Sequence, residues 1–269
     1  MPAMTVIDFH THAFPDSLAG RAIATLEAEA DYVWRAKLDG RVSSLVASMD
    51  AAGIARSVVC PIATRPEHFD GILKWCIAIR SERIVPLASV HPAAPDVTSQ
   101  IRRIAEAGLA GLKLHPMYQD FEIDEPRLDG LYAAAAEAGL IVVLHCGFDI
   151  AYPGSTQAHP HRVATVRDRY PELKLVATHL GGFKAWDEVR RHLAGRDVWM
   201  ETSFTLNWMS DQEVLELIRS HGTQRILFGT DSPWADQAEE LAHFRALGLG
   251  QDEQAAILGR NAERVLGGQ

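Results

Sequence analysis

The sequence predicts an α/β protein, a closed (β/α)₈ barrel that forms a single domain over residues 1–269. Three observations lead to this prediction: eight short β-branched runs recur along the chain, amphipathic helical patterns lie between them, and the runs are almost continuously apolar. Such runs are typical of parallel strands covered by helices. An open doubly wound sheet is the alternative. That fold usually carries a Gly-rich turn after its first strand, where this chain has His10-Thr11-His12.

The predicted strands are short, as expected for strands buried on both faces. In chain order they span Thr5–Phe9, Ser57–Pro61, Ile84–Val90, Gly111–Leu114, Leu140–Leu144, Leu173–Thr178, Val198–Glu201 and Arg225–Phe228. Eight strands separated by helical patterns are enough to close a barrel, and barrels of this kind commonly have about 250 residues.

The helices are predicted from apolar residues at helical spacing. This spacing is clear in Val42–Ala52 and in Asp211–His221. Pro126 stands where a helix would begin, and three glycines stand where helices would end: Gly53, Gly108 and Gly139. The stretch Phe14–Gly40 departs from the regular spacing and is predicted to be a long loop over the barrel mouth.

Composition excludes several kinds of partner. The chain has 269 residues, 47% of them hydrophobic, and a formal net charge of −9 with no Lys/Arg run, which argues against nucleic acid or an anionic membrane surface. No apolar run approaches the ~20 residues of a membrane span. Residues 1–9 lack the features of a signal segment. Three cysteines without paired spacing indicate a reducing cytoplasm.

Chemistry-bearing side chains stand at the ends of the predicted strands, where barrel enzymes place their reactive groups. His10 and His12 are two residues apart on one strand, so their imidazoles share a face and can bind one metal ion. Similar residue types end the later strands: His91, Lys113, His115, His145, His179 and Asp231. Together they predict one polar cluster at the mouth of the barrel.

Five motifs resemble those of the amidohydrolase superfamily of metal-dependent barrels. They cover the chain from end to end as Asp8-Phe9-His10-Thr11-His12, Gly111-Leu112-Lys113-Leu114-His115-Pro116, Leu144-His145-Cys146-Gly147, Thr178-His179-Leu180-Gly181-Gly182 and Phe228-Gly229-Thr230-Asp231-Ser232-Pro233. The sequence is most similar to the amidohydrolase-related (amidohydrolase 2) branch, which includes decarboxylases, lactonases and hydratases of carboxylated substrates.

The resemblance implies His10, His12, His145 and Asp231 as metal ligands. It places His179 beside the metal, either as an acid/base group or as a ligand of a second ion. Three imidazoles and one carboxylate leave an open position for water, whose pKa a bound Zn²⁺ lowers to about 7. Asp231 would then accept the proton of that water. Zn²⁺ is the metal expected first, with Mn²⁺ and Fe²⁺ as alternatives, in one ion or two.

Lys113 is open to three interpretations. It is an ammonium that binds a substrate carboxylate or takes part in catalysis, a carbamate that bridges two metal ions as in some superfamily members, or a salt-bridged lysine of the barrel wall. His115 shares the face of Lys113 and is a candidate substrate-binding residue, as are Tyr118 and Trp234, which follow barrel strands. Lys113 and Arg65 are the cations available to an anionic small-molecule substrate.

The leading functional hypothesis is a metal-dependent hydrolase of an amide, ester or lactone, with Asp231, His179 and Lys113 as catalytic residues. A nonoxidative decarboxylase or hydratase of a small carboxylated substrate is the alternative on the same scaffold. A barrel that binds metal or ligand without turnover is the third hypothesis, although it would be expected to have lost the water-activating acid. Homo-oligomerisation is left open by the sequence.

Overall fold

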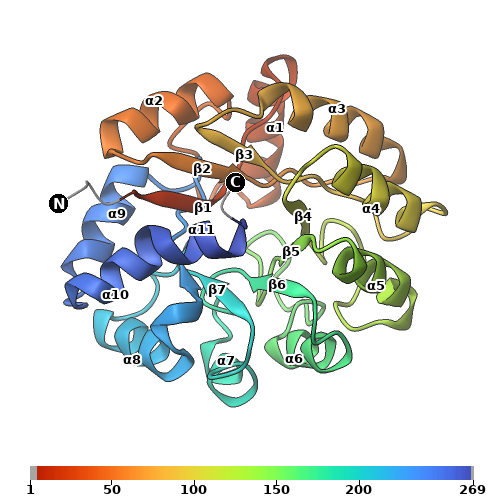
Figure 1. Cartoon of the computed structure of the whole chain (residues 1–269). Coiled ribbons are helices and arrows are strands. Elements are labelled where there is room, and N and C mark those ends of the chain that lie inside the picture. Colours follow the sequence, from red (N-terminus) through yellow and green to blue (C-terminus); the bar gives the residue numbers. More distant parts are fainter. Residues whose placement is uncertain (1–4, 268–269) are drawn as a thin grey trace.

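The computed structural model describes residues 5–267, in which eight parallel strands surround a central axis and helices surround the strands (Figure 1). The strands are β1 (Ile7–Thr11), β2 (Arg56–Val59), β3 (Ile84–Pro86), β4 (Gly111–Leu114), β5 (Ile141–Leu144), β6 (Lys174–Ala177), β7 (Trp199–Glu201) and β8 (Ile226–Leu227). Every predicted strand is confirmed. The largest difference is at β3, which ends four residues before the predicted Val90.

Hydrogen bonds join the strands into a ring. Neighbouring strands pair in parallel within two sheets, β1-β2-β3 and β4-β5-β6-β7-β8. At one seam the Ala88 amide donates to Gly111 O over 2.9 Å, and at the other the Phe9 amide donates to Phe228 O over 2.8 Å. These bonds link β3 to β4 and β8 to β1. The predicted (β/α)₈ barrel is therefore confirmed.

Helices form the outer layer of the barrel. They are α1 (Asp16–Glu29), α2 (Val42–Ala52), α3 (Phe69–Ile79), α4 (Val97–Glu106), α5 (Asp129–Glu137), α6 (Pro160–Arg169), α7 (Trp186–His192), α8 (Asp211–His221), α9 (Gln237–Ala246), α10 (Gln251–Ala255) and α11 (Asn261–Val265). Short 3-10 turns lie at Pro66–His68, Pro126–Leu128 and Thr223–Arg225, and a π-helical segment, Ala256–Arg260, joins α10 to α11. The bounds of α2 and α8 are as predicted. Left-handed φ angles of 73°, 69° and 65° confirm helix-ending roles for the three glycines named above.

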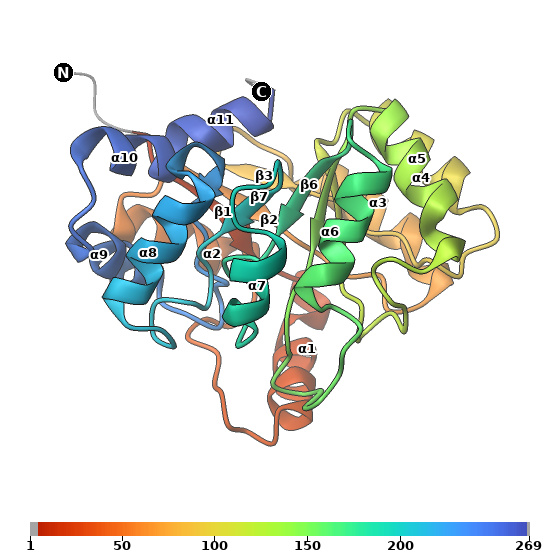
Figure 2. The same ribbon diagram turned by 90° about the horizontal axis from the view of Figure 1, so that it is seen from below.

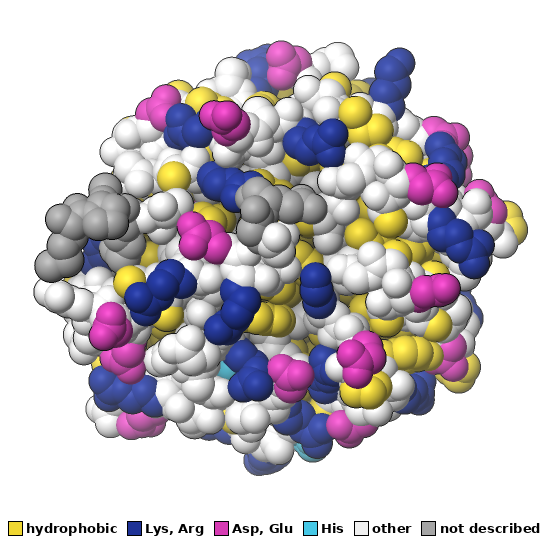
Figure 3. Space-filling view, in the orientation of Figure 1, with side chains coloured by type: hydrophobic (Ala, Val, Ile, Leu, Met, Phe, Trp, Pro, Cys, Tyr) yellow, Lys and Arg dark blue, Asp and Glu magenta, His cyan; other side chains and the backbone are white. Residues whose placement is uncertain are grey.

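The barrel is closed at one end by the C-terminal helix. Ala262 and Val265 of α11 pack with Ile7, Val143 and other inward-facing strand residues in one buried cluster. Figure 2 shows α11 at this end and α1 at the opposite end. Over the face closed by α11, basic and acidic side chains are interspersed with apolar ones (Figure 3). None of the helices within residues 5–267 has the length and apolar character needed to cross a membrane.

The prediction of an irregular loop over Phe14–Gly40 is wrong in part, because this stretch contains the 14-residue helix α1. Leu18, Ala22 and Leu26 recur every four residues, which is helical spacing, and alanines around them favour a helix. The location is as predicted: α1 and the chain that follows it project from the open end of the barrel (Figure 2).

His221 also differs from expectation. We expect histidines in helical stretches to lie on the surface, but this one is 3% exposed. It follows Val214 and Leu217 at helical spacing on the buried face of α8, and its Nε2 lies 2.8 Å from Val198 O. A carbonyl partner satisfies Nε2 where the apolar face of the helix buries the ring.

Candidate metal centre

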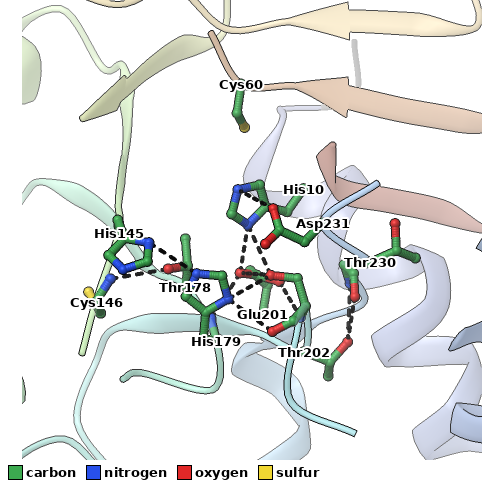
Figure 4. A network of polar contacts seen from close by, with 12 residues as sticks. His10, Cys60, His145, Cys146, Thr178, His179, Glu201, Thr202, Thr230 and Asp231 are labelled. Atoms are coloured by element: carbon green, nitrogen blue, oxygen red, sulfur yellow. Dashed lines mark hydrogen bonds and ion pairs between the residues drawn. The ribbon is translucent and has the colours of Figure 1, made fainter. Parts of the chain in front are cut away.

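The strand-end residues converge at the open end of the barrel, at the base of a cavity of about 470 Å³. His10 comes from β1 and Lys113 from β4, and His145, His179 and Asp231 follow β5, β6 and β8. All five line the cavity. Figure 4 shows His10 next to Asp231 and joined by a dashed line to Glu201, and His145 pointing toward His179.

Three ligand-type atoms form the first group. His12 Nε2 lies 3.1 Å from His10 Nε2 and 3.0 Å from Asp231 Oδ1, and His10 Nε2 lies 3.5 Å from the same oxygen. Two nitrogens that bind Zn²⁺ at about 2.0–2.1 Å in a tetrahedral site stand about 3.3 Å apart. The spacing therefore fits three ligands of one divalent ion.

The hydrogen-bond partners of the two rings fix which nitrogen is free. His10 Nδ1 lies 3.0 Å from Glu201 Oε1, and His12 Nδ1 lies 2.8 Å from Cys60 O. Both oxygens accept, so each Nδ1 carries a proton and donates it. In the neutral rings both Nε2 atoms then hold lone pairs, and these face each other. A cation between the two atoms would remove this repulsion.

Charge and burial agree with a cation at this position. Burial, followed by the charge of Lys113, lowers the pKa of His10 to about 4, so this ring is neutral at pH 7. For Asp231, burial raises the pKa, but the neighbouring His10 and His12 outweigh burial and hold it well below its usual value. Its Oδ1 atom is buried and receives no hydrogen bond. An ionised, unpartnered carboxylate oxygen is a suitable ligand for a divalent metal.

Beside the first group, two further histidine nitrogens carry lone pairs at the cavity. His145 Nε2 lies 3.0 Å from Phe148 O, and His179 Nδ1 lies 3.0 Å from Ser203 O, so both of these nitrogens donate. The remaining atoms, His145 Nδ1 and His179 Nε2, are 3.1 Å apart. The ligand set that the resemblance implies is thus divided in this structure: His145 faces His179 and groups with His115 and Asp149, apart from the first group.

Lys113 lies next to the first group. Its side chain is fully buried, and its Nζ is 3.4 Å from His10 Nε2. Its charge acts on both His10 and His145, which places it near both groups of ligand atoms. Burial lowers the pKa of Lys113, which favours the neutral amine. The salt-bridged wall lysine is not supported, because no carboxylate pairs with Lys113 among the ion pairs of residues 5–267.

Glu201 is a site residue that the sequence reasoning missed. It ends β7, is fully buried, and accepts hydrogen bonds from His10 Nδ1, the His179 amide and Ser203 Oγ. Burial raises its pKa, but the charge and hydrogen bond of His10 outweigh burial and lower it to about 2. A glutamate at the end of a barrel strand is itself a sequence signal, because strand seven otherwise contributes no polar residue to the predicted cluster.

Backbone strain is concentrated at the same place. His179 and Asp231 have φ angles of 58° and 68°, in the left-handed region that side chains other than glycine rarely adopt. Gly229 allows Glu201 to approach, since a Cβ there would lie 2.3 Å from Glu201 Oε2. Strained residues that the surrounding structure holds in place are typical of functional sites.

Asp8 connects the first strand to the last beneath the ligands. Its Oδ1 accepts from the amides of His10 and Thr230, and its Oδ2 accepts from Thr230 Oγ1 and Gln237 Nε2. Burial raises the pKa of Asp8 to about 7, although these hydrogen bonds oppose the shift. The network fixes the ends of β1 and β8, which carry His10 and Asp231.

The predicted substrate-binding residues also reach the cavity. His115, Tyr118 and Trp234 all line it. The His115 ring stacks on His145 with centroids 4.1 Å apart, and its Nε2 lies 3.4 Å from Asp149 Oδ2. Asp149, which the sequence reasoning did not select, belongs to the loop after β5 and lines the same cavity. These residues place polar groups on the β4–β5 side.

We expect Glu201→Gln to weaken metal binding about ten- to a hundredfold, because a carboxylate that accepts from a ligating histidine orients the ring and raises its basicity. Competition with a chromogenic chelator measures this affinity. Glu216→Gln, on the exposed face of α8, is the matched control. Unchanged metal affinity in Glu201→Gln, with the fold intact, would contradict the role assigned to Glu201.

The family model described as Amidohydrolase matches the chain over residues 7–268. No curated protein matches the chain.

Solved structures share the barrel at low sequence identity. An uncharacterised TIM-barrel protein from Bordetella bronchiseptica is 21% identical, with a TM-score of 0.80 over 98% of this chain and 99% of that one. A 5-carboxyvanillate decarboxylase from Novosphingobium aromaticivorans with bound manganese is 14% identical, with a TM-score of 0.72 over 98% and 97%. A protein assigned as a 2-pyrone-4,6-dicarboxylic acid hydrolase from Pseudomonas putida is 18% identical, with a TM-score of 0.69 over 99% and 98%. At these identities the likeness shows the fold.

Proposed function

The chain belongs to the amidohydrolase family, and from this membership we propose that it is a metal-dependent hydrolase that cleaves an amide, ester or lactone of a small molecule. One observation carries the proposal: the lone pairs of His10 Nε2 and His12 Nε2 face each other beside the unpartnered Asp231 Oδ1, at the base of a cavity. Bound there, a divalent cation would polarise the carbonyl and make a bound water acidic.

The residues of the chain would have separate roles around the ion and the substrate. His10, His12 and Asp231 would hold the ion, and the Asp231 carboxylate would accept a proton from the attacking water. His145 Nδ1 and His179 Nε2, whose lone pairs face each other, would contribute to holding a second ion. His115, Tyr118 and Trp234 orient the substrate in the cavity. Zn²⁺ is the first candidate because imidazole and carboxylate suit it, and Mn²⁺ is the second because the Novosphingobium relative binds it.

A second ion beside the first would favour the bridging interpretation of Lys113. An ammonium 3.4 Å from His10 Nε2 would repel the ion that this nitrogen binds. A neutral amine adds to CO₂ with release of one proton and forms a carbamate, an anion that would supply a carboxylate-type ligand from β4. We propose that Lys113 is carboxylated in the metal-loaded protein.

Lys113→Ala is expected to reduce the metal content of the protein from two equivalents to one or fewer, because the bridging anion is lost. Elemental analysis of protein loaded in bicarbonate buffer measures the stoichiometry. Lys184→Ala, which changes a lysine outside the metal centre, is the control. One equivalent in both the parent protein and Lys113→Ala would support the ammonium interpretation and contradict the carbamate.

A nonoxidative decarboxylase is the alternative function, favoured by the structural likeness to the 5-carboxyvanillate decarboxylase. A metal-binding barrel without turnover is less well supported, since Asp231 and the facing histidines are all in place. A panel of amides, esters, lactones and aromatic carboxylates, with zinc- and manganese-loaded protein, separates the three. Carbonyl hydrolysis supports the proposal, CO₂ release supports the alternative, and neither reaction on any compound supports the third.

The setting we propose is a reducing cytoplasm. Cys60, Cys76 and Cys146 are free and buried, and burial raises the pKa of each thiol to about 12. Thiols of this kind are unreactive and form no disulfide framework.

A further inference from the structure

The cavity above the metal centre has an apolar wall built from two parts of the chain. Leu18, Ala22 and Leu26 line it from one face of α1. Trp34, from the segment after α1, and Phe204, after β7, line it from another side. The aliphatic helix face and the aromatic residues therefore both border the space that a substrate would fill.

The aromatic part is a packed cluster and continues down to the metal centre. The Trp34 ring lies 4.8 Å from Phe204 and 5.7 Å from Trp208, measured between centroids, and Phe204 lies 6.5 Å from His179. Trp34 is fixed by its Nε1, which donates to Trp234 O over 2.7 Å. Phe204 has a φ of 53°, a left-handed conformation that a side chain adopts at a cost. Its ring is held on the cavity at the expense of backbone strain.

Charges in the upper cavity do not suit a polyanion. Apart from Lys113 in the metal centre, Arg21 on α1 is the one Lys or Arg among the described residues that line the cavity. Glu29 of the same helix and Asp149 face the same space. Arg65, a cation that the sequence offered for an anionic substrate, does not line it. In the upper cavity a second carboxylate would find one cation, Arg21, beside the acidic Glu29 and Asp149, an environment that favours an uncharged group over a second anion.

We propose that the substrate is an uncharged amide or ester with an aromatic or extended apolar group, and that this group binds between α1 and the Trp34–Phe204 cluster. The inference rests on the proposed hydrolase function, since it takes the reacting carbonyl to lie at the metal centre. A volume of about 470 Å³ is in the range of sites for drug-sized ligands. Phe204 and Trp34 are then specificity-determining residues for the apolar group.

Calorimetric titration of the full chain with three probes tests this selectivity without turnover. The probes are 4-phenylbutanamide, butanamide and phthalate, measured with metal-loaded and with chelator-treated protein. We expect 4-phenylbutanamide to bind at least tenfold more tightly than butanamide in both forms, and phthalate to bind at least tenfold more weakly than 4-phenylbutanamide in chelator-treated protein. Equal affinity for the two amides, or tighter binding of phthalate to chelator-treated protein, would overturn the inference.

Single-residue variants test where the phenyl group of the probe binds. Trp34→Ala and Phe204→Ala should each weaken the binding of 4-phenylbutanamide at least fivefold. Tyr32 is an exposed aromatic residue outside the cavity, so Tyr32→Ala should leave the affinity unchanged. Leu26→Arg adds a cation to the helix face and leaves the aromatic cluster unaltered. It should strengthen the binding of phthalate and weaken the binding of 4-phenylbutanamide. If Leu26→Arg changes neither affinity, the helix face does not bind the probe and the inference fails.

Release of ammonia from 4-phenylbutanamide, followed in the same samples, separates the two proposals. Hydrolysis breaks the C–N bond, adds the oxygen of water to the carbonyl carbon, and yields 4-phenylbutanoate and ammonium. Selective binding without hydrolysis of this or any other amide or ester contradicts the proposed function and leaves the apolar selectivity standing. Hydrolysis with no preference for the phenyl group contradicts the selectivity alone.

Discussion

Replacing Asp231 by asparagine is expected to lower kcat about a thousandfold on any amide, ester or lactone that the enzyme cleaves. The carboxylate contributes to two steps, because it binds the ion together with His10 and His12 and accepts the proton of water. Its pKa is held well below the usual value, since the neighbouring histidines outweigh burial, so it is ionised throughout the neutral range. An amide of the same size keeps the shape and loses both roles. Initial rates at saturating substrate measure the effect.

Asp187→Asn is the matched control, because this aspartate is exposed on α7 and pairs with Arg190 three residues away. It should leave kcat unchanged. Thermal unfolding of both variants shows whether the fold is retained. An Asp231→Asn enzyme that is folded and keeps more than about a tenth of the parental kcat would contradict the assignment of Asp231.

His179→Ala is expected to lower kcat by about 10² or more and to remove one equivalent of metal. The ring supplies one of the two facing lone pairs of the second group, with His145 Nδ1 3.1 Å away. Without it, His145 retains a single nitrogen toward the cavity, too few ligands for tight binding. Elemental analysis and rate measurements on the same preparation test both parts of the expectation.

His192→Ala provides the comparison for this variant, since His192 lies on α7 and pairs with Glu188 away from the cavity. A His179→Ala protein that keeps full metal content but loses activity would assign His179 to proton transfer in place of metal binding. Full activity with full metal content would show that His179 has no role in metal binding or catalysis.

The barrel was predictable because the pattern of apolar residues, which is a local property of the sequence, differs between its strands and its helices. Continuous apolar runs mark β1 to β8, and helical spacing gave α2 and α8 with their bounds. The helix α1 was missed because its apolar face is not buried against the barrel: Leu18 is 41% exposed and faces a cavity. The apolar stripe of such a helix is weaker than that of a helix buried on a sheet.

Most members of the candidate site were predictable, but Glu201 and Asp149 and the arrangement of the whole set were not. His10, Lys113, His145, His179 and Asp231 could be identified because strand ends meet at one end of a barrel. How they divide into two groups depends on which ring nitrogen each histidine directs to the cavity. Distant atoms such as Cys60 O and Ser203 O decide this, and their positions depend on tertiary structure.

The central claim is that His10, His12 and Asp231 bind a divalent cation. Titration of Zn²⁺ into chelator-treated protein, followed by calorimetry, tests it most directly. We predict binding with a Kd below about 1 μM, as for other sites with several histidine and carboxylate ligands, and loss of this tight binding in the His10→Ala/His12→Ala double variant. Weak binding of equal strength in the parent protein and the double variant would contradict the claim.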